Sequence, residues 1–225
     1  MSAAKAQVQV EVRRVSSFKS DTICSQLKNF NNFVTKSTDF RIISTNQLKH
    51  TTMGYTHYFK GTKSTDAKFK EFSNACKKLH DNLPEKTDTA GGYHKDDKLI
   101  IGDGRGHLHE STGDVPIFDN RMVCFNGVGE LAHETFRIEK KGTNDFCKTA
   151  RKPYDLLVVA CLIAAWQILN YRFSSDGFNS DGTCEDLVPA MQYYNEVMQP
   201  KNKITGLPEP ITEAMLWEQR KKYRD

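Results

Sequence analysis

Three cations and one hydroxyl stand directly before an apolar run, in the segment FCKTARKPYD of residues 146–155. Lys148, Arg151 and Lys152 carry the charges, and Thr149 carries the hydroxyl. At the start of an expected helix, each uncompensated positive charge costs about 0.3–1 kcal/mol, because the helix dipole is already positive there. The pattern therefore predicts a negative partner. That partner is either a bound phosphate, cradled by these side chains and the free helix N–H groups, or carboxylates of the chain itself.

Polar rings crowd a second segment, MGYTHYF of residues 53–59. In a strand, Tyr55 and His57 share one face and Tyr58 lies on the other. Such rings can stack on a nucleotide base whose phosphate meets Lys148 and Arg151. The alternative is that they are core or interface aromatics. The segment is thus a ligand-binding candidate with a structural alternative.

Cys147 is a candidate nucleophile because it stands beside Lys148 and Arg151. Neighbouring cations lower the pKa of a thiol and favour the nucleophilic thiolate. With His57 or His133 nearby, this would be a Cys–His hydrolase or transferase. The alternatives are a cysteine that packs in the core and a histidine that is hydrogen-bonded on a strand. Whether the protein is an enzyme stays open.

Two further places offer metal or sugar contacts. His107 and His109 alternate, and alternating strand histidines share a face as metal ligands do, although the surrounding glycines favour a loop. Asp176, in the SSDG segment, can bind a sugar hydroxyl or a magnesium ion that accompanies a phosphate, or it can be a turn residue. No other cofactor is indicated.

A central helix over about residues 153–171 is expected to position the cation segment. Its unbroken apolar run, residues 156–166, is shorter than the roughly 20 residues of a membrane span, so it predicts a helix buried nearly all round. The first 14 residues lack the apolar region of a secretory signal. The six cysteines are scattered, which favours reduced thiols. We therefore expect a protein without a membrane span or signal peptide, in an intracellular setting.

The remaining patterns predict a small, mostly antiparallel sheet packed on this helix, together with further amphipathic helices: an α+β fold. His133–Phe136 is expected within a strand, and Thr183 with Asp186 is expected to form a capping box that opens a helix. Three parts are predicted: a strand–helix–strand extension (1–52), a core domain (53–200) and a linker with a C-terminal helix (201–225). Within the core domain, the expected elements are strands near 55–60, 98–102, 121–126 and 134–138 and a helix at 65–83.

The amino-acid composition excludes few classes of function. The 225 residues are 27% charged and 38% hydrophobic, an ordinary globular mix, with a formal net charge of +4. This mildly basic balance is compatible with nucleic acid or an acidic partner without requiring either. Nucleic acid is therefore not excluded.

Five segments together resemble an uncharacterised family of proteins met in bacteriophages, bacteria and some large DNA viruses. They are MGYTHYF (53–59), FNG (125–127), HETF (133–136), FCKTARKPYD (146–155) and SSDG (174–177). The resemblance covers the landmarks of residues 53–198. It implies a phage- or virus-type origin, and hence a place in an infected or host cell's cytoplasm or in the virion. It implies no particular activity.

Three functions stay open. The favoured one is a soluble domain that binds, and in a stronger form processes, a small phosphate-bearing ligand such as a nucleotide. Unlike polar residues are dense in the matched segments, which favours this reading. The second is a virion structural or assembly protein, homo-oligomeric or bound to other virion subunits, whose motif residues pair internally. The third is a Cys–His or metal-assisted hydrolase.

Overall fold

The computed structural model describes residues 54–86, 98–104, 115–201 and 209–224. The chain divides into two units, residues 1–50 and 51–225, and every described residue belongs to the second. The predicted strand–helix–strand extension of residues 1–52 therefore lies outside the described residues.

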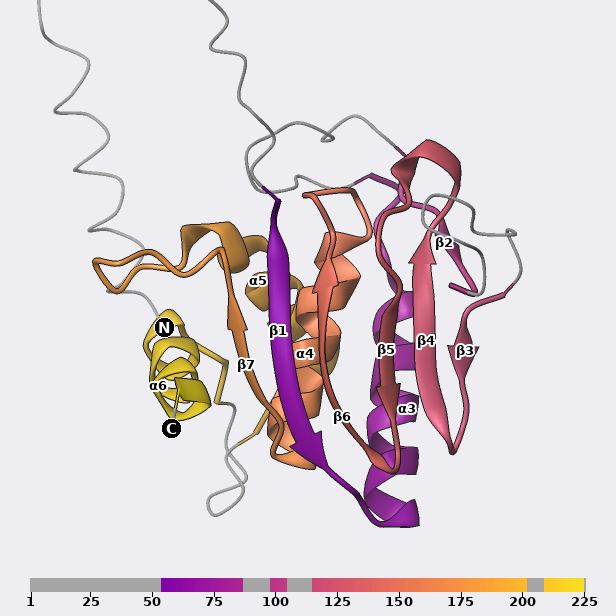
Figure 1. The fold of residues 1–225 in the computed structure, drawn as a ribbon, viewed down its shortest axis with the longest axis horizontal. Coiled ribbons are helices and arrows are strands. Elements are labelled where there is room, and N and C mark those ends of the chain that lie inside the picture. The colour runs from indigo at the N-terminus through magenta and orange to yellow at the C-terminus, as the bar shows by residue number, and fades with distance from the viewer. Residues whose placement is uncertain (1–53, 87–97, 105–114, 202–208, 225) are drawn as a thin grey trace, which may run out of the picture. The chain divides into compact units, whose positions relative to one another are not determined.

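The strands form two antiparallel sheets. The first has the order β6-β1-β7, and in the second β4 pairs with β5 on one edge and with β2 and β3 on the other. Figure 1 shows α3, α4 and α5 on one face of these strands, while no described helix covers the opposite face. The predicted α+β class is confirmed. The strands are β1 Thr56–Thr62, β2 Ile101–Gly102, β3 Ile117–Phe118, β4 Met122–Gly127, β5 Phe136–Glu139, β6 Gly142–Lys148 and β7 Arg172–Ser175.

The central helix is α4, Asp155–Leu169. Every residue from Asp155 to Ala165 is buried, as the unbroken apolar run predicts. Asn170 ends the helix in the left-handed conformation, with φ of +58°, a conformation that asparagine tolerates better than most residues. None of the helices in the described part of the chain is long and apolar enough to cross a membrane.

Helix α3, Asp66–Asp81, shows how an apolar stripe becomes a packed face. Thr65 caps its N-terminus by accepting a hydrogen bond from the Lys68 N–H. The three–four spacing of Phe69, Phe72, Cys76, Leu79 and Leu83 predicts an apolar face, and the first four of these side chains are fully buried while Leu83 is half-buried. The helix starts and ends within two residues of its predicted bounds.

A chain of phenylalanine rings joins the two sheets. Phe136 of β5 contacts Phe59 of β1, with 5.5 Å between ring centroids, and Phe125 of β4, with 4.9 Å. All three side chains are completely buried. Their packing fixes one sheet against the other, so it also fixes the ends of the strands that carry the motifs.

The C-terminal helix α6, Glu213–Arg224, closes the free edge of β7. The Gln219 side chain accepts from the Phe173 N–H at 3.1 Å and donates to the Phe173 carbonyl at 2.9 Å, as a neighbouring strand would. Gln219 is almost fully buried, so the strand edge gains a partner that also shields it from other chains.

The predicted capping box at Thr183 is wrong. The Thr183 hydroxyl donates to the Asp181 carboxylate at 2.8 Å. A short 3₁₀ helix, Glu185–Leu187, follows, and α5 begins only at Val188 and runs to Met198. The Asp186 carboxylate instead forms an ion pair with Arg151. A tertiary ion pair has taken the carboxylate that the local pattern assigned to a helix cap.

Alkaline pH is expected to destabilise this core. Burial raises the pKa of the Cys76 and Cys147 thiols and of the Tyr154 phenol well above their usual values. The folded state thus keeps protons that the unfolded chain loses above about pH 8.5–9, so stability is complete below that pH and falls as pH rises. Deprotonation of these two thiols in the unfolded chain should by itself lower the free energy of unfolding by about 3–4 kcal/mol between pH 8 and pH 10. Urea unfolding at both pH values measures this, and an unchanged midpoint would contradict it.

Candidate functional site

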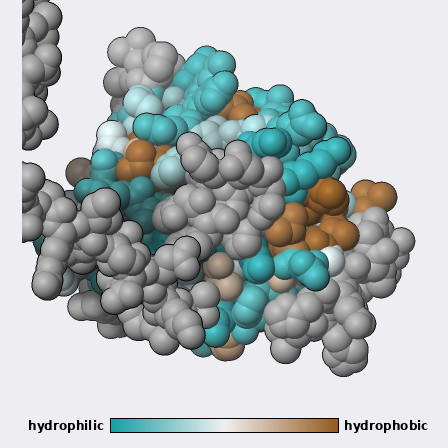
Figure 2. All heavy atoms as spheres, turned by 90° about the horizontal axis from the view of Figure 1, so that it is seen from above, coloured by the Kyte–Doolittle hydropathy of each residue, from teal (hydrophilic) through white to brown (hydrophobic). Residues whose placement is uncertain are grey.

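Three motif segments that are far apart in the sequence meet at one end of the first sheet. The backbone N–H groups of Thr149 and Ala150 both donate to the Tyr55 carbonyl, at 3.0 and 3.2 Å. On the other side of β1, the Thr56 N–H donates to the Asp176 carboxylate at 2.9 Å, and the Asp176 N–H donates to the Thr56 carbonyl. This end is at the top of Figure 1, and the described residues seen there are mostly hydrophilic in Figure 2.

Two carboxylates lie at the cation segment: Asp186 forms an ion pair with Arg151, and Asp155 is bound by buried polar side chains. Asp155, the first residue of α4, accepts from the Thr149 hydroxyl at 2.5 Å and from His57 Nε2 at 2.7 Å through the same oxygen. An ionised carboxylate only accepts, so its partner nitrogen on His57 carries the hydrogen. All three side chains are buried, and the helix N-terminus is occupied from within the chain.

The predicted phosphate cradle at the helix N-terminus is therefore wrong in part. Thr149 and His57 face the buried network rather than a ligand. Lys152 does not line the cavity found at this end. Only Arg151, of the four residues in the predicted cradle, does so.

Arg151 is held in place from two sides. Its guanidinium lies 4.0 Å from the centre of the Tyr55 ring, and its Nη1 is 2.7 Å from an Asp186 oxygen. Ala150 and Arg151 both have positive φ, +49° and +59°, which costs residues with a Cβ roughly 1–2 kcal/mol each. Backbone strain of this kind collects where the surrounding structure fixes a side chain for function.

A cavity of about 520 Å³ opens beside Arg151. Its lining residues are mostly polar or charged: Arg151, Arg220, Asp176, Ser174, Ser175, Tyr55 and Tyr58, with Gly54 and Phe178. The Arg220 guanidinium lies over the Phe178 and Trp217 rings, 5.1 and 4.6 Å from their centroids. The volume is ordinary for a small-ligand site. The structure thus brings Tyr55, Arg151 and Asp176 of the predicted ligand residues to one cavity.

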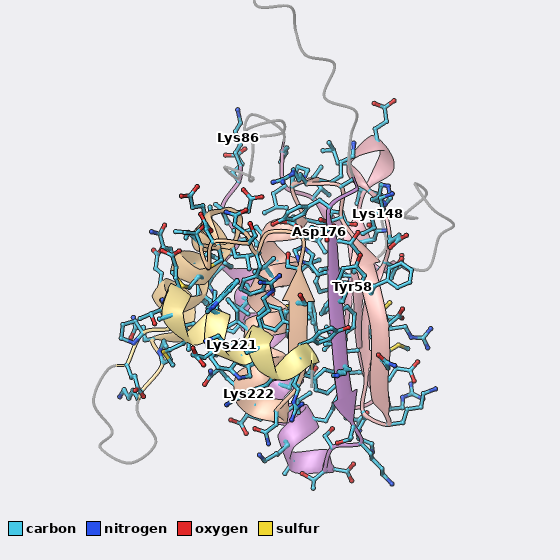
Figure 3. The ribbon with its side chains drawn as sticks, turned by 60° about the vertical axis from the view of Figure 1, so that its left-hand side comes forward. Tyr58, Lys86, Lys148, Asp176, Lys221 and Lys222 are labelled. Atoms are coloured by element: carbon cyan, nitrogen blue, oxygen red, sulfur yellow. The ribbon has the colours of Figure 1, made fainter. Side chains whose placement is uncertain are left out.

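Lys148 lies at the rim. A Cβ placed on Gly54, which lines the cavity, would be only 2.8 Å from Lys148 Nζ, so the ammonium group sits directly over that glycine. Its backbone N–H donates to the Glu134 carboxylate at 2.6 Å. Figure 3 shows Lys148, Asp176 and Tyr58 grouped near the start of β1.

Cys147 is not an activated nucleophile. It is fully buried, and its thiol donates to the Glu134 carbonyl at 3.3 Å. Burial, followed by the negative charges of Glu134 and Asp155, raises its pKa well above the usual value, which contradicts the expected effect of the neighbouring cations. The thiol lies opposite His57 across β6 and β1, but it stays protonated at neutral pH.

We expect alkylation to show that the Cys147 thiol is unreactive in the folded protein. At pH 8 the folded protein should leave Cys147 unmodified by iodoacetamide, because both burial and the raised pKa deny the reagent a thiolate. Mass spectrometry of tryptic peptides measures the labelled fraction. Full labelling after denaturation in urea is the control, and rapid labelling of Cys147 in the folded state would restore the nucleophile hypothesis.

His133 and Glu134 do not lie on a strand. They precede β5, and their backbone is taken up by side chains: Asn126 donates to the His133 carbonyl at 2.8 Å, and the Tyr154 hydroxyl donates to the Glu134 carbonyl at 2.8 Å. The expected strand position of His133 is therefore wrong, and the residue does not line the cavity. The FNG and HETF motifs instead make hydrogen bonds that connect β4, β6 and the start of α4.

The predicted histidine metal ligands, His107 and His109, lie outside the described residues. Within the described ranges, no group of three or more His, Cys, Asp or Glu side chains is arranged to hold a metal ion.

Sequence reasoning missed two contributors to the site. Arg220 comes from α6, for which the sequence predicts only a C-terminal helix, and Asp186 is predicted to cap a helix. Ser174 was matched only as part of the SSDG motif. No local pattern links these positions to residues 54–58, because their contact is created by the fold.

Comparison with protein-family models, curated proteins and solved structures finds no match for this chain.

Proposed function

We propose that this domain binds a small phosphate-bearing ligand of nucleotide type in the cavity at the ends of β1 and β7. The supporting observation is that two arginines, Arg151 and Arg220, line one cavity of about 520 Å³. Guanidinium groups bind phosphate in bidentate fashion, and two of them on a partly enclosed wall favour an anion over a neutral ligand.

The other wall groups suit the rest of a nucleotide. Tyr58 is 39% exposed and offers a ring face to a base, and the Asp176 carboxylate can accept from sugar hydroxyls or hold magnesium beside the phosphate. Lys148 at the rim adds a third cation, and its ammonium group has no ion-pair partner among the residues that the structure describes. Likeness of the motifs to phage and virus proteins supports an origin of that type.

Thermal unfolding with a ligand panel tests the proposal. The panel contains inorganic phosphate, mono- and trinucleotides, cyclic dinucleotides and NAD, each with and without magnesium. A ligand at 100 times its Kd adds about 2.7 kcal/mol, which should raise Tm by roughly 5–10 °C for a domain of this size.

The matched variants are Arg220→Ala and Arg121→Ala. Both remove one guanidinium, but Arg121 is exposed and does not line the cavity. It lies in the turn between β3 and β4, which Figure 1 draws at the opposite end of the strands from the start of β1. We expect Arg220→Ala to abolish the ligand-induced rise and Arg121→Ala to keep it. A rise that survives in Arg220→Ala, or none with any ligand on the well-folded wild type, would refute the proposal.

A further inference from the structure

The outer face of the first sheet carries an exposed aromatic pair beside the cavity. Tyr58 of β1 and Phe146 of β6 are directly opposed in the strand register, with ring centroids 6.4 Å apart. They are 39% and 52% exposed, although both are large and partly apolar. Tyr58 also lines the cavity, so the pair extends the cavity wall across the sheet.

Four cations without an ion-pair partner among the described residues lie on the strands of this sheet and on α6, and the Lys60 ammonium group lies over the Tyr223 ring, 4.8 Å from its centroid. Lys60 and Lys148 lie on the same outer face of β1 and β6, Arg172 lies on β7 next to Lys60, and Lys222 follows on α6. None of these four forms an ion pair with a described residue, although the Arg172 guanidinium donates to the Lys222 carbonyl. Figure 3 shows Lys148, Tyr58 and Lys222.

The cations of the second sheet and of its turns differ in their ion pairing. Each is matched to a carboxylate: Arg137 and Lys141 to Glu139, Lys140 to Asp66, and Arg121 to Asp119. Unmatched positive charge among the strand residues is thus gathered around the exposed rings. A neutral protein partner needs no such charge, whereas a polyanion with stacking groups is complementary to both features.

We propose that the occupant of this face is a single-stranded nucleic acid, with a terminal nucleotide in the cavity and the following bases stacked on Tyr58 and Phe146. The inference rests on the proposed function and extends its ligand from a nucleotide to an oligonucleotide. Strand faces that present aromatic rings bind unstacked bases, and the flanking cations bind the backbone phosphates. A duplex hides its base faces and lacks this complementarity.

Binding of a fluorescently labelled thymidine octamer, followed by anisotropy, tests the inference. Phe146→Ala should weaken octamer binding about 5- to 150-fold, the range found for loss of one base–aromatic stack. Ile100→Ala, which truncates another exposed apolar side chain, should leave it unchanged. With about three or four phosphates neutralised, log K should fall with log salt with a slope of about −2 to −3.

The wild-type titrations separate the two proposals. If a mononucleotide binds and the octamer binds no more tightly, the oligonucleotide inference fails while the cavity's function stands. If neither binds, the proposed function itself fails. Equal affinity for a duplex of the same length, or an octamer affinity unaffected by Phe146→Ala, would likewise overturn the inference.

Discussion

Phe136→Ala is expected to lower the free energy of unfolding by about 3–5 kcal/mol, the usual cost of truncating a buried phenylalanine. Its ring is fully buried and is the one that meets Phe59 of the first sheet and Phe125 of the second. The truncation therefore leaves a void at the junction between the sheets. For a domain of this size, Tm should fall by roughly 6–20 °C.

Phe146→Ala is the matched control because it removes the same side chain from the solvent-exposed face. We expect its free energy of unfolding to stay within about 0.5 kcal/mol of the wild type. Urea unfolding of both variants gives the comparison. Equal losses in the two variants would show that the Phe136 ring does not join the sheets in the way described. The same pair separates stability from binding, since only Phe146 lies on the proposed nucleic-acid surface.

Local patterns were sufficient for the elements that bury apolar side chains. The unbroken run of α4 and the three–four spacing of Phe69, Phe72, Cys76 and Leu79 in α3 each predict a helix whose burial the structure confirms. In both cases one segment of sequence contains the whole signal. The sequence patterns do not predict β3, β6 or β7, so two of the three strands of the first sheet come from the structure alone.

The site could be predicted only in part, because its chemistry depends on contacts across the chain. The crowding of cations before α4 correctly required an anion, but the sequence left open whether it was a ligand or a carboxylate. For Arg151 the partner is the Asp186 carboxylate, whereas the Asp155 carboxylate accepts from Thr149 and from His57, which is 98 positions away. Likewise, Arg220 reaches the cavity from α6, and Asp186 leaves its predicted cap for Arg151. Each depends on tertiary packing that periodicity does not encode.

Both competing hypotheses stay predictions, and each describes some of the motif residues. Internal pairing of motif residues, expected of a structural protein, describes Thr149, His57 and Asp155. Convergence of polar residues on a cavity, expected of a binding protein, describes Arg151 and Asp176. The hydrogen bonds among Thr149, His57 and Asp155 hold the loop that precedes α4. Arg151, in the same loop, has a positive φ and lines the cavity. The internally paired Thr149 and Asp155 and the cavity-lining Arg151 thus belong to one segment, residues 149–155.

The strongest test of the hydrogen-bond network of Asp155, His57 and Thr149 is Asp155→Ala. It removes the acceptor shared by His57 and Thr149 and leaves two buried donors without it, each costing about 1–3 kcal/mol. We therefore expect a loss of about 2–6 kcal/mol in the free energy of unfolding. Asp66→Ala is the matched control, because Asp66 is likewise the first residue of a helix but its side chain is 87% exposed. Its loss should be clearly smaller, because an exposed carboxylate contributes only a screened dipole effect and a surface ion pair.

A double-mutant cycle then assigns the loss to the network rather than to the helix. Thr149→Val keeps the shape of the side chain and removes the hydroxyl donor. Once Asp155 is replaced by alanine, the hydroxyl has no acceptor to lose, so the second substitution should cost less than it does in the wild type. The coupling energy should fall in the range of about 0.5–3 kcal/mol that is typical of groups in one hydrogen-bond network. Strictly additive losses would mean that Asp155 stabilises α4 only through its dipole. The loop carrying Arg151 would then need another anchor.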